Sequence, residues 1–79
     1  MIERKSLPVD DENSVAIVTE RMADGTWAVV TSVKHRSPTG EQITDLPVRD
    51  ARYGSQSEAE EAGVSQGREY IDRNMPHAA

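Results

Sequence analysis

Basic residues are the first candidates for chemistry in this chain of 79 residues. Five of them could bind an anion or a nucleic-acid phosphate: Lys34, His35, Arg36, Arg49 and Arg52. The alternative is structural, because Arg36 would face Glu41 across a predicted hairpin and form a cross-strand ion pair there. We favour the ion pair, since the net charge of −5 works against binding to a polyanion.

Acidic residues and histidines give no stronger signal. Asp10, Asp11 and Glu12 are consecutive, but adjacent carboxylates without a shaped loop do not enclose a divalent cation. His35 and His77 are far apart in the sequence, and no H-E-x-x-H, G-x-S-x-G or phosphate-loop motif occurs. We therefore predict a protein that is not an enzyme, with no catalytic residue, metal or cofactor.

Length and composition limit the remaining possibilities. A chain of 79 residues is long enough for one domain, and its apolar inventory, without phenylalanine, predicts a thin core. The absence of cysteine excludes disulfides and fits a reducing compartment. No stretch resembles a signal peptide or reaches membrane-spanning length. We expect a bacterial protein that is located in the cytoplasm and makes no membrane contact.

The segments that must position these residues begin with two predicted strands, 14–22 and 26–36. Both are rich in β-branched residues, and Ala23-Asp24-Gly25 separates them. A three-residue turn with Gly25 in the left-handed region would pair Arg21 with Trp27. That register gathers apolar residues on one face of the hairpin, whereas a one-residue shift would scatter them. They are Val15, Ile17, Trp27, Val29 and Val33.

A third strand is predicted over 41–48. The turn Ser37-Pro38-Thr39-Gly40 precedes it and would place Glu41 opposite Arg36. Continuing this register would bring Leu46 and Val48 onto the apolar face of the hairpin. Pro47 cannot donate a hydrogen bond to a neighbouring strand, so this strand should lie at a sheet edge.

A helix is predicted from Ser55 to about Arg73 or Asn74. Ser55 and Glu58 have the spacing of a capping box, and Pro76 prevents a longer helix. Small residues dominate the inward stripe, and its two glycines should allow close approach to the sheet beneath Trp27. The stripe is Ala59, Ala62, Gly63, Gln66, Gly67, Tyr70 and Ile71.

Together these elements predict the α+β fold class: a three-stranded antiparallel β-meander packed on one C-terminal α-helix. The domain would cover 14–75, with a flexible N-terminal arm over 1–13 and a tail over 76–79. Ile2, Leu7 and Val9 could instead fold the arm back onto the domain.

The sheet face that points away from the helix is the strongest functional candidate. One helix covers one face of a sheet, yet the middle of the second face is apolar in the predicted register. Its candidate protein-interface residues are Val18, Met22, Ala28, Val30 and Ile43. Either a second copy, another protein or the chain's own N-terminal arm could cover them. We favour an interaction or regulatory module that forms a homodimer or binds an unknown partner. The alternative is an accessory nucleic-acid-binding protein that uses the five basic residues.

In element order, residues 14–74 resemble small sheet-plus-helix DNA-binding domains, such as phage integrase arm-binding domains and AP2-like domains. The stretch YGSQSEAEEAGVSQGREYID, which follows the aromatic-bearing hairpin, is similar to segments of short bacterial and prophage-type proteins. The resemblance implies that the outer sheet face enters a DNA groove with basic or polar side chains. Here that face offers Lys34, acidic residues and an apolar centre, so no functional residue is transferred from these families.

Overall fold

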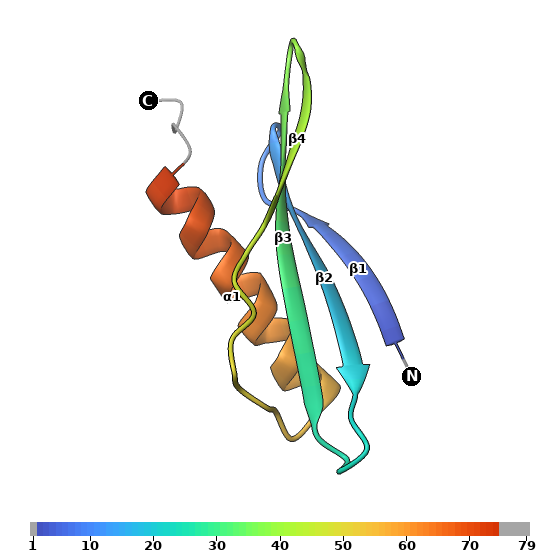
Figure 1. Cartoon of the computed structure of the whole chain (residues 1–79). Helices are drawn as coiled ribbons and strands as arrows, with labels where there is room; N and C mark the ends of the chain where they lie inside the picture. The colour runs from blue at the N-terminus through green and yellow to red at the C-terminus, as the bar shows by residue number, and fades with distance from the viewer. Residues whose placement is uncertain (1, 75–79) are drawn as a thin grey trace.

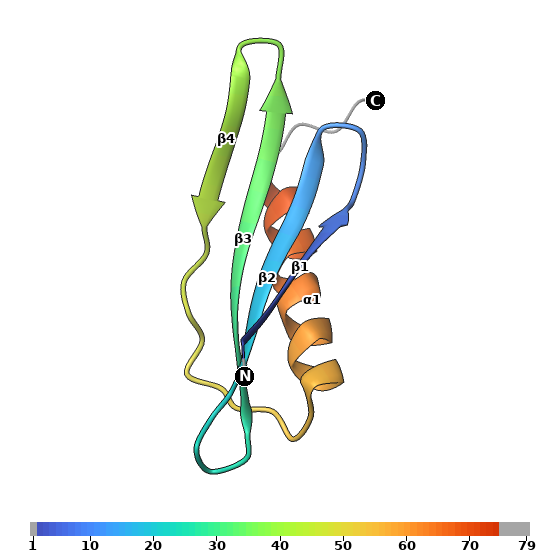
Figure 2. The ribbon, with the colours of Figure 1, turned by 90° about the vertical axis from the view of Figure 1, so that its right-hand side faces the viewer.

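The computed structural model describes residues 2–74, and the predicted tail with His77 lies outside them. The elements follow the chain as strands β1 to β4 and then helix α1 (Figures 1 and 2). Their bounds are β1 Ile2–Pro8, β2 Asn13–Arg21, β3 Trp27–Ser37, β4 Gly40–Asp45 and α1 Gln56–Asn74. Each strand pairs antiparallel with the next, in the order β1-β2-β3-β4. The predicted α+β class is confirmed: an antiparallel meander sheet is followed by one C-terminal helix packed on it.

The register of the central hairpin is as predicted. Arg21 pairs with Trp27, and the ladder continues through Ile17 opposite Thr31 to Val15 opposite Val33. The backbone N–H of Met22 donates to Thr26 across the turn, at 2.7 Å. Gly25 has a φ of 89°, the left-handed conformation that the three-residue turn requires. This turn therefore decides which side chains of β2 and β3 meet the helix.

The N-terminal segment differs from the prediction of a flexible arm. It contains strand β1, which pairs with β2 along its whole length, so the sheet has four strands rather than three. Every side chain of β1 is exposed, so burial gives this strand no sequence signature. What places it is the free edge of β2, whose backbone N–H and C=O groups need partners. Asp10 closes the connecting loop, because its Oδ1 accepts from the backbone N–H groups of Glu12 and Asn13 at 2.8 Å.

Strand β4 lies at a sheet edge as predicted, but it ends at Asp45 instead of reaching Val48. Leu46 is still buried, and its N–H donates to the carbonyl of Thr31 at 3.0 Å. Pro47 has no N–H to extend this ladder, so the chain leaves the sheet after Leu46. Val48 is consequently 66% exposed, and its predicted place on the buried face was wrong.

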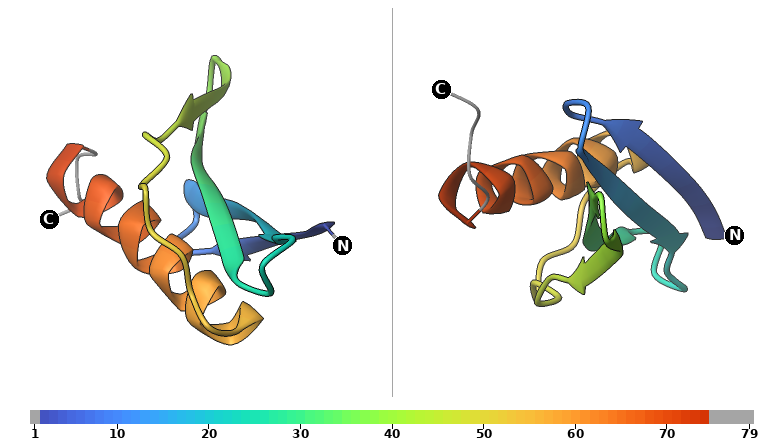
Figure 3. Two further views of the ribbon diagram at one scale, coloured as in Figure 1. Left: turned by 60° about the horizontal axis from the view of Figure 1, so that its bottom comes forward. Right: turned by 90° about the horizontal axis from the view of Figure 1, so that it is seen from above.

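Helix α1 packs on one face of the sheet, over β2 and β3 (Figure 3). The buried apolar side chains between them are Val15, Ile17, Val33, Leu46, Ala59 and Ile71. A Cβ added to Gly63 would lie 2.8 Å from Val29 and 2.9 Å from Ile17. The close approach therefore occurs over these aliphatic residues rather than beneath Trp27, whose backbone pairs with Tyr53.

The helix begins where the capping signal predicts. The Ser55 hydroxyl accepts from the backbone N–H of Glu58 at 3.2 Å. The Glu58 carboxylate accepts from the N–H of Gly54, also at 3.2 Å, one residue before the expected partner Ser55. Both contacts satisfy backbone groups at the entry of α1 and fix its direction from the preceding connector.

Candidate functional site

The sheet face opposite α1 is covered by no other element among the described residues (Figure 3). We call it the outer face. Val18 and Val30 are directly paired at its centre, with Arg4 beside Val18 on β1. Val30 is 44% exposed and Ile43, on β4, is 65% exposed. The outer face therefore combines a paired apolar centre with exposed apolar side chains toward its edges.

Val18, Ala28, Val30 and Ile43 belong to this face by their alternation along the strands, whereas Met22 follows the end of β2 and lies at the hairpin turn. Val18, Met22 and Ala28 are half-buried by their neighbours, whereas Val30 and Ile43 are exposed. Sequence reasoning missed Ile2 and Arg4, which β1 adds to the same face opposite Glu20 and Val18. The alternation of Ile2, Arg4 and Ser6 is too polar to mark a strand without the partner β2.

The N-terminal segment does not cover the outer face, because β1 lies in the plane of the sheet and widens it. Ile2 joins the outer face and is 59% exposed there. Leu7 pairs with Val15, so its side chain lies on the helix side of the sheet. Val9 packs against the buried core. Within residues 2–74, the N-terminal segment therefore does not cover the outer face.

Charges on the outer face are balanced, although the whole chain carries −5. Three basic and three acidic residues alternate onto it: Arg4, Lys34, Arg36, Glu20, Glu41 and Asp45. Lys34 and Arg36 both approach the carboxylate of Glu41, at 3.2 Å and 3.8 Å. The excess of negative charge therefore lies on the helix side of the sheet and in the connectors.

The five basic residues do not form one patch. Lys34 and Arg36 share Glu41, while the ring of His35 lies on the opposite face, with Nδ1 2.8 Å from Oδ1 of Asn13. Arg49 and Arg52 lie in the connector between β4 and α1, which runs to the other end of the sheet (Figure 1). The predicted cross-strand pair of Arg36 with Glu41 is confirmed.

The acidic run 10–12 forms the loop between β1 and β2, where Asp10 bonds to the loop backbone and to Asn13. Residues 2–74 contain no group of three or more histidine or acidic side chains arranged to hold a metal ion. In the same part of the chain, no helix is long and apolar enough to span a membrane.

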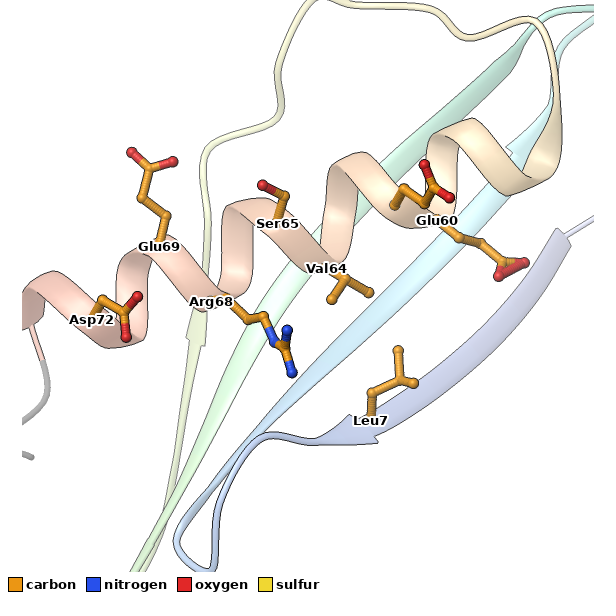
Figure 4. A pocket seen from close by; sticks show the side chains of 8 residues that line it. Leu7, Glu60, Val64, Ser65, Arg68, Glu69 and Asp72 are labelled. Atoms are coloured by element: carbon orange, nitrogen blue, oxygen red, sulfur yellow. The ribbon is translucent and has the colours of Figure 1, made fainter.

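A second feature was missed by sequence reasoning: a cleft of about 600 Å³ between β1 and α1 (Figure 4). We call it the β1–α1 groove. Leu7 and Val64 face each other across it. The other residues that line it are Glu60, Glu61, Ser65, Arg68, Glu69 and Asp72. This groove depends on β1, so it could not be inferred while residues 1–13 were taken as a flexible arm.

One ion pair bridges the groove. Nζ of Lys5 lies 2.9 Å from Oε2 of Glu60, and Gln56 also donates to Glu3 across the same gap. The hydrogen bond and the charge of Glu60 raise the pKa of Lys5 above its ordinary value. Long side chains thus connect β1 to the helix near its N-terminus, while Leu7 and Val64 lie further along the groove (Figure 4).

No protein-family model, curated protein or solved structure matches this chain. The resemblance to small sheet-plus-helix DNA-binding domains therefore rests on element order alone.

Proposed function

We propose that this chain is a small non-enzymatic protein-interaction or regulatory module that self-associates through its outer face in the cytoplasm. The observation that carries the proposal is the uncovered apolar centre of this face, where Val18 pairs with Val30. Burial of that centre against a second copy would remove exposed Val30 and Ile43 from water.

Charge balance supports a second copy as the occupant. Two chains of net charge −5 repel each other at long range, but the outer face contributes equal numbers of acidic and basic residues. A twofold-symmetric contact between two such faces adds no net like-charge repulsion at the interface. The helix side, which is more acidic, would stay in solvent.

The dimensions of the face predict a weak dimer. Four strands about 4.8 Å apart, with paired lengths of about 25 Å, give roughly 500 Å² on each copy. Two such faces bury about 1,000 Å², which is at the lower limit for specific association. We therefore expect monomer and dimer to exchange at high micromolar concentration.

Sedimentation equilibrium or light scattering tests this proposal. The wild-type mass should rise from 8.7 kDa toward twice that value at high micromolar concentration. Val30→Glu should keep the chain monomeric, because it places a charge at the centre of the face. Val48→Glu is the matched control, since Val48 is exposed in the connector and should leave association unchanged. A wild-type chain that stays monomeric, or equal effects of both substitutions, would refute self-association through this face.

The alternative of nucleic-acid binding has less structural support. Its five basic residues are divided between two faces of the sheet and the β4–α1 connector, and Lys34 and Arg36 already approach Glu41. Binding of duplex or single-stranded DNA at low salt, where phosphate contacts are strongest, would support this alternative.

A further inference from the structure

We infer that the β1–α1 groove is a docking site for a basic amphipathic helix of a partner protein. This surface lies on the helix side of the sheet, so the inference does not depend on the self-association proposed above. It rests on three properties of the groove: its width, its apolar floor and its charge.

The width follows from the layering of the fold. Four strands about 4.8 Å apart span about 14 Å between the outer strand axes, and one helix about 10–12 Å wide leaves only an edge strand of such a sheet uncovered. Because α1 packs over β2 and β3, the strip above β1 has no helix of its own (Figure 3). A second helix placed beside α1 would rest on this strip and on the flank of α1, and it would extend past the edge of the sheet.

The floor of the groove gives such a helix an apolar surface. Leu7 projects from β1 and Val64 from α1, and the two side chains approach each other from opposite walls (Figure 4). Leu7 is 38% exposed although it pairs with fully buried Val15. An apolar side chain of a partner placed between them would contact both walls and remove Leu7 from water.

The rim determines the charge of the partner. Four of the eight lining residues are acidic and lie along α1: Glu60, Glu61, Glu69 and Asp72. Arg68 is the one basic residue in the lining. Lys5 and Arg73 pair with two of these carboxylates, which still leaves the groove net negative. A partner with lysine or arginine flanking its apolar stripe matches this rim, whereas an acidic helix would be repelled.

A designed peptide serves as the probe. It has about 18 residues of leucine and lysine with an apolar stripe at helical spacing. One control has the same composition in scrambled order, and a second replaces every lysine with glutamate. The peptides are titrated into the ¹⁵N-labelled full chain at low salt. We expect saturable shifts at the amides of Leu7, Val64 and Arg68 for the amphipathic basic peptide only.

Substitutions then separate docking in the groove from general charge attraction. Glu61→Lys should weaken binding about fivefold or more, because Glu61 lines the groove. Asp50→Lys changes net charge equally in the exposed connector and should change the dissociation constant less than twofold. Leu7→Ser should also weaken binding about fivefold, with amide-peak dispersion verifying that the variant is folded.

Three results would overturn the inference. The first is equal binding of the acidic or the scrambled peptide, and the second is equal effects of Glu61→Lys and Asp50→Lys. The third is the absence of saturable shifts at the groove residues. Shifts that are confined to the outer face count as this third result. Repeating the titration in the Val30→Glu background should give the same dissociation constant, because groove docking and self-association use opposite faces.

Discussion

Gly67 of α1 lies so close to β2 that an added Cβ would stand 2.6 Å from a methyl group of Val15. Val15 is fully buried and belongs to the central part of the sheet, with β1 on one side of its strand and β3 on the other. An added Cβ would therefore force Val15 or the helix to shift. The distance between helix and sheet is therefore set by the absence of a side chain at position 67.

Gly67→Ala should destabilise the fold by about 1–3 kcal/mol through overpacking. Helix propensity alone predicts the opposite sign, because alanine is about 1 kcal/mol better than glycine in an exposed helix. Urea denaturation measures the free energy of unfolding. Ser65→Ala is the control, since Ser65 is exposed on the same helix and should be neutral or slightly stabilising.

A double-mutant cycle identifies the contact responsible. Val15→Ala removes the two methyl groups that a Cβ at position 67 would meet. If that clash is the cause, Gly67→Ala should cost less in the Val15→Ala background than in the wild type. Additive costs would mean that Gly67 is required for another reason.

Leu46 and Val48 should differ sharply in their effect on stability. Leu46 is 6% exposed and contacts the core, whereas Val48 is 66% exposed after the chain has left the sheet. Leu46→Ala should cost about 2–5 kcal/mol, and Val48→Ala about 0.5 kcal/mol or less. Thermal unfolding of the two variants beside wild type measures the difference. Comparable losses of stability would indicate that strand β4 reaches Val48 in solution.

The sequence predicts those parts of the fold in which buried and exposed side chains alternate along the chain. Val15 and Ile17 alternate with half-buried residues, and Gly25 closes the one turn that keeps this alternation in phase with β3. Strand β1 has no buried side chain, so no apolar alternation marks it in the sequence. Pairing with the edge of β2 and the contacts of Glu3 and Lys5 with α1 hold it in place.

The same reasoning applies to the candidate sites. The outer face could be predicted because register alone assigns Val18, Val30 and Ile43 to it. The groove could not, since it requires Leu7 to be held beside Val64 by a strand with no apolar pattern. The separation of Arg52 from Lys34 likewise depends on the path of the connector, which local sequence does not determine.

A part-buried chain of hydrogen bonds joins the β1–β2 loop to β3. Nδ2 of Asn13 donates to the two carboxylate oxygens of Asp10 at 3.1 Å and 3.0 Å. Oδ1 of Asn13 lies 2.8 Å from Nδ1 of His35. Because an amide oxygen can only accept, Nδ1 of His35 is the donor. Neutral His35 should thus carry its proton on Nδ1, which ¹⁵N chemical shifts of the ring can show. A ring protonated only on Nε2 would contradict this arrangement.

Asn13→Ala should cost about 1–3 kcal/mol, because it removes a partner from both Asp10 and His35 in a part-buried site. Ser14→Ala is the neighbouring control, since residue 14 alternates onto the outer face and should change the free energy of unfolding little. Urea denaturation compares the two variants. Equal effects would mean that the chain through Asn13 does not stabilise the loop.

Asp24 offers a pH-dependent test of the turn that sets the register. The Thr26 hydroxyl donates to Oδ1 of Asp24 at 2.6 Å and the Thr26 backbone N–H donates at 3.0 Å. These hydrogen bonds, the hydroxyl first, lower the pKa of Asp24 below its ordinary value of 3.8, and Arg52 adds a smaller effect of the same sign. The folded state thus favours the charged carboxylate. Its contribution to stability is present above pH 3.8 and is lost as the pH falls through the folded-state pKa.

Thr26→Val should therefore raise the pKa of Asp24 toward 3.8, because valine keeps the shape of threonine and removes the hydroxyl donor. An NMR titration of the Asp24 carboxyl carbon measures the shift. Arg52→Gln is the matched comparison and should raise the same pKa by less, since its charge acts at longer range. A larger effect of Arg52→Gln would show that charge, rather than the hydroxyl hydrogen bond, sets the pKa of Asp24.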